Sequence, residues 1–150
     1  MVPTPVNNQI NELLLEEEVC LAVKKGTIDQ SSISQGELNG FSLLQLDKSP
    51  FADLLQHYLN TQDIHPHYLL RSGDRGLLLQ LVAAGYGGCL VPKLSWSSLI
   101  NHDKIDLLRI GNRGFHRHIY LSYSPGPRTK KQQEVHKLLV TYCHNLTNPQ

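Results

Sequence analysis

The segment from Leu81 to Pro92 runs Leu-Val-Ala-Ala-Gly-Tyr-Gly-Gly-Cys-Leu-Val-Pro and joins a predicted helix to a predicted strand. Gly85 follows a helical pattern of leucines and suits the left-handed cap of a helix. The apolar run that starts at Cys89 is ended by Pro92, as is typical of a short buried strand. A phosphate-binding loop follows a strand and opens a helix, which is the opposite order. The segment therefore argues against a nucleotide site.

Strand and helix patterns alternate on both sides of this segment. The clearest helix start is Ser49-Pro50, because a serine hydroxyl can cap the first turn and a proline suits the first helical position. A second start is Ser34-x-x-Glu37, which has the spacing of a capping box. The predicted strands are 13–23, 41–46, 67–71, 87–92, 105–110 and 119–123, and the predicted helices are 34–38, 50–59, 77–82, 96–100 and 130–145. This alternation predicts an α/β domain with a mainly parallel sheet.

The composition indicates a folded domain that is not built to bind nucleic acid. Hydrophobic residues make up 40% of the chain and charged residues 18%, unlike a disordered chain. The 14 basic and 13 acidic side chains give a net charge of +1, far from the basic balance of DNA-binding or RNA-binding domains. The longest apolar run, Val19 to Val23, is much shorter than the ~20 residues that span a bilayer, and no secretory signal is visible. We therefore expect a cytoplasmic protein with no membrane partner.

Residues capable of catalysis or metal binding are present, but not in patterns that support either function. The pairs His65-x-His67 and His116-x-His118 offer two nitrogens each, fewer than a zinc site needs. No Gly-x-Ser-x-Gly element occurs, and we expect the acidic triplet Glu16–Glu18 to lie in a solvated turn or at a strand edge. The sequence therefore predicts no catalytic residue, no metal and no cofactor. Three widely spaced cysteines in apolar contexts are predicted to be buried and reduced: Cys20, Cys89 and Cys143.

Two turns at which a strand passes into a helix are the best candidates for a binding site. Ser49 and Ser72 each stand at such a turn, so two helix N-termini could direct backbone N–H groups into one crevice. Open α/β sheets bind small molecules in the crevice at the carboxyl ends of their strands. Nearby cations would favour an anion: Lys48, Arg71 and Arg75. The alternative is that both serines only cap their helices, and the residues alone leave these two interpretations equally open.

Several segments resemble the effector-binding domain of LysR-type transcriptional regulators. Residues 33–40, Ile-Ser-Gln-Gly-Glu-Leu-Asn-Gly, look like that family's I-S-x-x-E-L-x-G step, and residues 81–92 look like its L-V-A-A-G-x-G-x-x-x-x-P segment. Leu15–Val23 resembles the strand before the family's distal lobe, and His118–Leu139 resembles its closing strand and helix. The similarity extends over nearly the whole chain from about Glu12.

The resemblance implies a type II periplasmic-binding-protein-like α/β fold, in which a small-molecule effector lies between two lobes and the function is regulatory and not catalytic. We expect the effector to be a small, anionic metabolite. The family often has a hydroxyl residue near Gly73, where this chain offers only a backbone. Carried over by position, the distal-lobe part of the ligand-binding site consists of Asp47, Lys48, Ser49, Pro50, Ser72, Gly73 and Asp74.

The resemblance also implies that residues 1–150 are a single effector-binding domain fragment. The family's winged helix-turn-helix, its linker helix and the first part of its proximal lobe have no counterpart before Met1. We expect residues 24–110 to form a complete distal lobe, and residues 12–23 and 111–146 to be remnants of the hinge and of a partial proximal lobe. DNA would then be bound only through a helix-turn-helix domain absent from this chain.

Loss of part of the proximal lobe predicts self-association into homodimers or larger oligomers. Apolar surface would be left uncovered on the strand Val19–Val23 and on the helix face around Val135 and Leu139. The main alternative function is that of a solute-binding protein fragment from a transport system, which shares the fold but needs a secretory start. An enzyme on a related fold is a third possibility.

Overall fold

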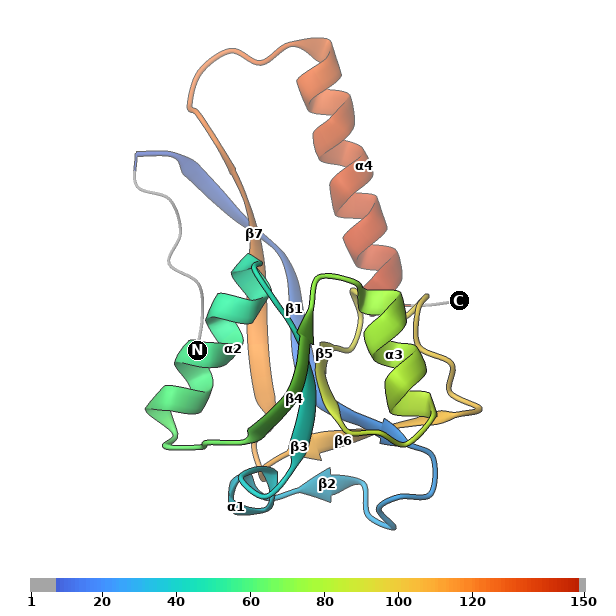
Figure 1. The fold of residues 1–150 in the computed structure, drawn as a ribbon. Helices are drawn as coiled ribbons and strands as arrows, with labels where there is room; N and C mark the ends of the chain where they lie inside the picture. The colour runs from blue at the N-terminus through green and yellow to red at the C-terminus, as the bar shows by residue number, and fades with distance from the viewer. Residues whose placement is uncertain (1–7, 149–150) are drawn as a thin grey trace. The chain divides into compact units, whose positions relative to one another are not determined.

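The structure is a computed structural model that describes residues 8–148. Contacts divide the chain into two compact units: unit 1 is Glu18–Phe115, and unit 2 consists of the described residues before Glu18 and after Phe115. No helix within residues 8–148 combines the length and the apolar character needed to cross a bilayer. The elements, drawn in Figure 1, are β1 (Ile10–Lys24), β2 (Ser32–Ile33), α1 (Gln35–Leu38), β3 (Ser42–Leu46), α2 (Pro50–Thr61), β4 (His67–Ser72), α3 (Arg75–Ala83), β5 (Cys89–Pro92), β6 (Ile105–Ile110), β7 (Phe115–Tyr123) and α4 (Lys130–Thr147).

Local sequence signals decide where the helices begin. The Ser34 hydroxyl accepts a hydrogen bond from the backbone N–H of Glu37 at 3.0 Å and caps α1. The Ser49 hydroxyl accepts from the N–H of Ala52 at 3.0 Å and caps α2, with a proline in its first turn. Both predicted helix starts are thereby confirmed. In α4 the cap is a threonine that forms a reciprocal capping box with a glutamine three residues on.

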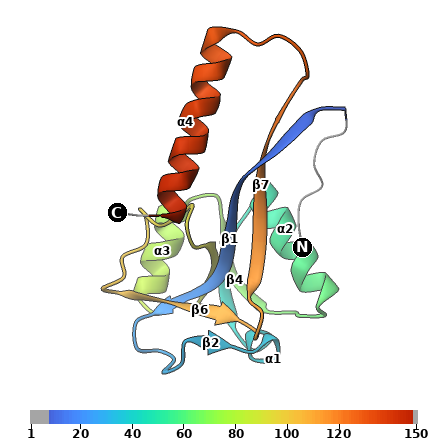
Figure 2. The same cartoon turned by 180° about the vertical axis from the view of Figure 1, so that it is seen from behind.

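The sheet of unit 1 is mixed, which corrects the expectation of a mainly parallel sheet. Its strand order is β2-β6-β1-β5, and a parallel bridge between Leu43 and Gly88 joins β3 to β5. β3 and β4 are parallel, because the helical crossover through α2 returns the chain in the same direction. The crossover through α3 does the same between β4 and the start of β5, where Gly88 bridges to Leu43 in parallel. β1 runs antiparallel to both β5 and β6, and it is followed by no such crossover. From behind, in Figure 2, β2 lies beside β6.

The core of unit 1 lies around β1, β3 and β5, with α2 and α3 on opposite sides of β3 (Figure 1). The run Val19–Val23 is at most 3% exposed and is hydrogen-bonded to β5 on one side and β6 on the other. The expectation of an uncovered apolar edge on this strand is therefore wrong, because unit 1 itself supplies both neighbours. Its burial on both faces matches its uninterrupted apolar sequence.

Residues 96–100 do not form the predicted short helix. The segment from Leu94 is a series of turns, in which the N–H of Ser97 bonds to the carbonyl of Leu94 and the N–H of Leu99 to that of Trp96. The Trp96 side chain is nonetheless 4% exposed and belongs to the core. Burial of the Trp96 indole in the core, and not helical periodicity, holds this segment in place.

Unit 2 combines the first part of β1, the part of β7 that follows Phe115, and α4. Glu17 is buried, and its carboxylate accepts hydrogen bonds from the guanidinium of Arg117, with Nε and Nη2 each 2.9 Å from Oε2. The acidic triplet Glu16–Glu18 was expected in a solvated turn or at a strand edge, but it lies within β1, and its middle member is enclosed with a cation. On α4, the predicted apolar face is exposed: Val135 by 55%, Leu138 by 69% and Tyr142 by 58%.

Candidate functional site

The two turns singled out from the sequence lie side by side. Leu46, the last residue of β3, is paired with Ser72, the last residue of β4. Beyond this pair, the backbone N–H of Asp47 donates a 3.0 Å hydrogen bond to the carbonyl of Ser72. Figure 1 shows α2 and α3 starting at this same end of the two strands. The structure thus brings all seven predicted site residues together at the carboxyl ends of two parallel strands.

The first turn is tight and uses its own polar groups. Lys48 has a positive φ of 52°, a conformation that is uncommon for a residue with a side chain. Its N–H donates to the Asp47 carboxylate at 3.0 Å, which holds the turn closed. The Ser49 hydroxyl is engaged in capping α2, and Pro50 has no N–H to offer. The exposed Lys48 ammonium is therefore the main group that this turn presents to a ligand.

In the second turn Asp74, and not Ser72, caps the helix. The Asp74 carboxylate accepts from the N–H of Leu77 at 3.1 Å, and the Ser72 hydroxyl accepts from the N–H of Asp74 at 3.1 Å. The Ser72 hydroxyl therefore stabilises the turn and does not cap α3. Within residues 8–148, the backbone N–H groups of three neighbours have no hydrogen-bond partner: Gly73, Arg75 and Gly76. These groups are the donors that a helix N-terminus directs at an anion.

The capping and binding interpretations therefore apply to different residues. Ser49 is occupied by α2, whereas the start of α3 retains donors after its cap is made. A Cβ built on Gly73 meets no atom within 4 Å, so the space above this donor is open. The glycine that departs from the family pattern thus leaves its backbone accessible.

Two arginines flank the second turn on aromatic supports. The Arg71 guanidinium lies 4.2 Å from the centroid of the Tyr68 ring, and that of Arg75 lies 5.8 Å from the centroid of Trp96. Stacking on a ring holds a guanidinium in place and leaves its edge free to bind a carboxylate or phosphate. Together with Lys48, they outnumber the two carboxylates of the turns, Asp47 and Asp74. The balance of charge at the site is positive.

No group of three or more potential metal ligands occurs in the part of the chain that the structure describes. The three cysteines are free and buried, as predicted. Burial raises the pKa of the Cys89 thiol to about 12, and burial together with the Glu18 carboxylate raises the pKa of the Cys20 thiol to about 12. Burial also raises the pKa of the Cys143 thiol. Thiols held protonated in this way are poor nucleophiles and poor metal ligands.

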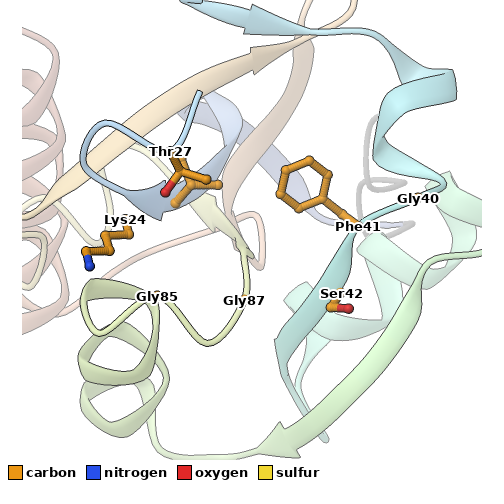
Figure 3. A pocket seen from close by; sticks show the side chains of 8 residues that line it. Lys24, Thr27, Gly40, Phe41, Ser42, Gly85 and Gly87 are labelled. Carbon is orange, nitrogen blue, oxygen red and sulfur yellow. The ribbon is translucent and has the colours of Figure 1, made fainter. Parts of the chain in front are cut away.

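One cavity was not anticipated from the sequence. It measures about 300 Å³ and is lined at one side by Lys24 and Thr27 and at the other by Phe41 and Ser42 (Figure 3). It lies at the amino end of β3, away from the two turns. No sequence motif marks it, because its walls come from three separate connections of unit 1.

Comparison with known proteins gives a single family. A family model described as the LysR substrate binding domain matches residues 3–144 of this chain. This match begins before Glu12, where the resemblance noted in the sequence starts, and reaches nearly the end of the chain. No curated protein matches the sequence.

Solved structures similar to this chain include regulatory domains of the same family. The regulatory domain of CcmR from Synechocystis PCC6803, in complex with 2-PG, aligns with a TM-score of 0.78 at 16% identity, over 97% of this chain and 72% of that one. The effector binding domain of QuiR in complex with shikimate aligns with a TM-score of 0.70 at 18% identity, over 92% and 66%. The regulatory domain of MetR from N. meningitidis aligns with a TM-score of 0.70 at 15% identity, over 94% and 63%. At these identities the likeness shows the fold, and this chain spans roughly two thirds of the aligned domains.

Proposed function

Because the chain belongs to the family of LysR substrate binding domains, we propose that it is an effector-sensing module that binds a small, anionic metabolite at the two adjoining turns and does not transform it. The fold class expected from the sequence, a type II periplasmic-binding-protein-like α/β domain, is confirmed by this membership and by the structural similarity. The observation that carries the proposal is the hydrogen bond from Asp47 to Ser72, which joins both turns into one surface.

Three features support an anionic ligand at this surface. The first is the set of N–H donors at the start of α3, on Gly73, Arg75 and Gly76. The second is the positive end of the α3 dipole, which favours negative charge. The third is the pair of ring-supported guanidiniums, on Arg71 and Arg75, which suit a planar carboxylate or a phosphate. Ser72 and Asp74 position the donors, and Lys48 adds a cation from the other turn.

The neighbouring proteins support a small-molecule ligand. CcmR and QuiR are described in complexes with 2-PG and shikimate. For this chain we propose residues 24–110 as the distal lobe, and residues 12–23 and 111–146 as hinge and proximal-lobe segments. A regulator of this kind works in the cytoplasm, reaches DNA through a separate helix-turn-helix domain and converts ligand binding into a shift between conformations. We also propose that the chain forms homodimers or larger oligomers.

The proposed effector site is tested by changing its charge and measuring the affinity for small anions. We would titrate the chain by calorimetry with a panel of small carboxylates and phosphates and with their uncharged amides. Lys48→Ala removes a cation and should weaken binding of the responding anion about threefold, the effect of one solvent-exposed charge. Asp74→Asn keeps a good helix cap while it removes a negative charge, so it should strengthen binding by a similar factor.

Lys93→Gln is the matched control, because it removes an exposed lysine of unit 1 that is not part of either turn. It should leave the affinity unchanged. NMR spectra of the ligand before and after incubation should be identical. Affinity that does not respond to Lys48→Ala and Asp74→Asn would contradict the site, and a ligand that is chemically altered would contradict the sensing function.

A further inference from the structure

The cavity at the amino end of β3 is separate from the effector site proposed above. Ser42, the first residue of β3, lines the cavity, whereas the turn at Asp47 follows the last residue of the same strand. Five residues of extended strand place the two roughly 15 Å apart. The cavity and the turns share no residue, so a ligand in one does not compete directly for contacts in the other.

The chemistry of the cavity wall is that of a site for an amphipathic anion. Val23 and Phe41 provide apolar surface. The lining also has two hydroxyls, that of Thr27 on the side of Lys24 and that of Ser42 on the side of Phe41 (Figure 3). Lys24 is the one charged residue of the lining. Within residues 8–148 its ammonium makes no hydrogen bond or ion pair, and neither hydroxyl has a hydrogen-bond partner. An uncompensated cation beside apolar surface favours an anion with an apolar part.

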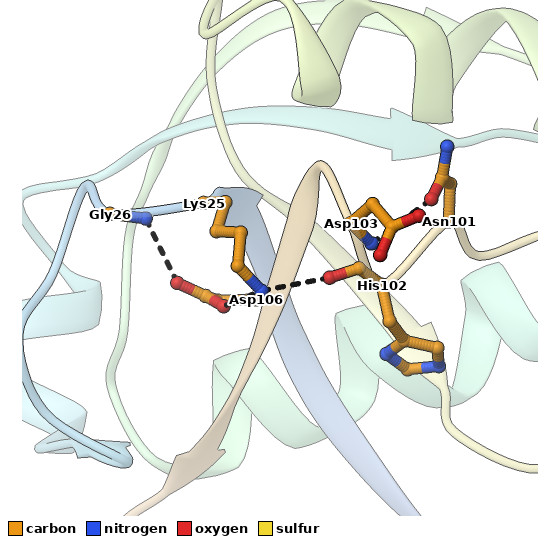
Figure 4. Close-up of polar contacts among 6 residues, drawn as sticks. All are labelled: Lys25, Gly26, Asn101, His102, Asp103 and Asp106. Carbon is orange, nitrogen blue, oxygen red and sulfur yellow. Dashed lines mark hydrogen bonds and ion pairs between the residues drawn. The ribbon is translucent and has the colours of Figure 1, made fainter.

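The turn that carries Lys24 and Thr27 is fixed in place from outside the cavity. The Asp106 carboxylate accepts from the N–H of Gly26 at 3.0 Å and lies 3.7 Å from the Lys25 ammonium. Lys25 in turn donates to the carbonyl of His102 at 2.9 Å (Figure 4). The N–H of Thr27 closes the turn by donating to the carbonyl of Lys24 at 3.0 Å. The cation and one hydroxyl of the cavity are thus presented by a preorganised backbone, which lowers the cost of binding.

The wall formed by Gly85 and Gly87 is equally constrained. A Cβ on Gly87 would lie 2.9 Å from the carbonyl oxygen of Ser42, so the two backbones are in direct contact. Gly85 has a φ of 89°, and a Cβ there would lie 3.0 Å from Cδ and 3.9 Å from Nζ of Lys24. The absence of a side chain at Gly85 lets the Lys24 stem lie across this residue, with the ammonium at the rim of the cavity. Glycines on this wall therefore both form the cavity and place its cation.

From this geometry we propose a second ligand site in unit 1, which binds a small organic anion, a carboxylate or phosphate that carries a short apolar group. The anion pairs with the Lys24 ammonium and accepts a hydrogen bond from the hydroxyl of Thr27, which lies on the same side of the cavity. Its apolar group packs against Phe41 and Val23. A volume of about 300 Å³ admits a molecule with one ring or a short aliphatic chain.

A titration of the ¹⁵N-labelled chain with benzoate, followed by amide chemical shifts, tests this site. Benzamide is the uncharged probe of nearly the same shape. We expect benzoate to produce saturable shifts at the amides of Thr27, Gly85 and Gly87, and benzamide to bind at least tenfold more weakly. Lys24→Gln should weaken benzoate binding about tenfold, the effect of one charge-assisted hydrogen bond, and should leave the fold intact because Lys24 has no described partner to lose.

Lys93→Gln serves as the control for the change in net charge and should bind benzoate like the unmodified chain. Equal binding of benzoate and benzamide, or an unchanged affinity in Lys24→Gln, would overturn the proposal. Shifts confined to residues 47–50 and 72–74 would also overturn it, and would at the same time support the effector site. Shifts at the cavity that persist in Lys48→Ala show that the two sites are distinct.

Discussion

The backbone N–H of Asp47 and the carbonyl of Ser72, joined by a hydrogen bond of 3.0 Å, make two turns from different parts of the chain into one surface. The turns are 25 positions apart in the sequence, yet this bond continues the ladder of two parallel strands past its last residue pair. A ligand held by either turn therefore lies on a surface to which two strands and two helix starts contribute.

The capping roles of the two serines differ, and their replacement should separate them. Ser49→Ala removes the cap of α2 and should lower the free energy of unfolding by about 1 kcal/mol. Ser72→Ala removes only a hydrogen bond within the turn and should lower the free energy of unfolding by about half as much. Urea denaturation followed by circular dichroism measures both. Ser49→Asp restores an acceptor and should recover most of the loss, whereas equal losses in the two alanine variants would contradict the assignment of Asp74 as the cap of α3.

Gly87 should not tolerate a side chain. In Gly87→Ala the new Cβ meets the Ser42 carbonyl oxygen at 2.9 Å and Leu44 Cγ at 3.3 Å, and the strand backbone cannot retreat without breaking its bonds to the next glycine. We expect a loss of about 2 kcal/mol in the free energy of unfolding.

Gly73→Ala is the matched control for this substitution, since a Cβ there meets nothing within 4 Å and the residue has no positive φ. It should leave the midpoint of urea unfolding nearly unchanged. A Gly87→Ala variant as stable as Gly73→Ala would show that β3 and β5 are not in contact at this point.

The buried thiols should resist alkylation and limit stability at high pH. With a pKa of about 12, Cys20 and Cys89 are thiolate in only about one molecule in ten thousand at pH 8. Iodoacetamide at pH 8 should therefore label them only after urea is added, as mass spectrometry of peptides would show. Labelling of either thiol in the native chain at the rate of a free cysteine would contradict their burial.

The raised pKa values of the thiols also determine how the stability of the chain changes with pH. Folding raises each thiol pKa above its ordinary value of 9.0, so the folded state disfavours the thiolate. The associated stability is fully present below pH 9 and is lost progressively as the pH rises from 9 towards 12. Cys89→Ala should show a shallower decline over this window. An identical decline in both chains would mean that other groups account for it.

Local and non-local parts of the fold were predictable to different degrees. Ser49-Pro50 and Ser34 specify helix starts through contacts within three residues, and these predictions are confirmed. The direction of β1 depends on which strands flank it, and these follow it by some seventy residues or more. Nothing near Glu17 indicates its burial, because the Arg117 that pairs with it is 100 positions away.

In the candidate site, too, local features were predictable from the sequence and features that depend on distant residues were not. Both Ser72 and Asp74 have capping side chains, and the sequence alone does not decide which one reaches the first free N–H. The assignment depends on where β4 ends, and the strand continues through Ser72 because it is paired with Leu46. The cavity beside Lys24 is less predictable still, since it is enclosed by three connections that no single motif describes.

The exposed face of α4 should drive self-association of this chain. Val135, Leu138 and Tyr142 recur at helical spacing, and each is more than half exposed. Leu138→Glu places a charge at the centre of this face, so light scattering should report an oligomer for the unmodified chain and a lower mass for the variant. Lys137→Glu is the control, because it changes the charge more but removes no apolar surface, and it should remain associated. If the unmodified chain were a monomer at high concentration, or if both variants dissociated alike, apolar contact between copies through α4 would be contradicted.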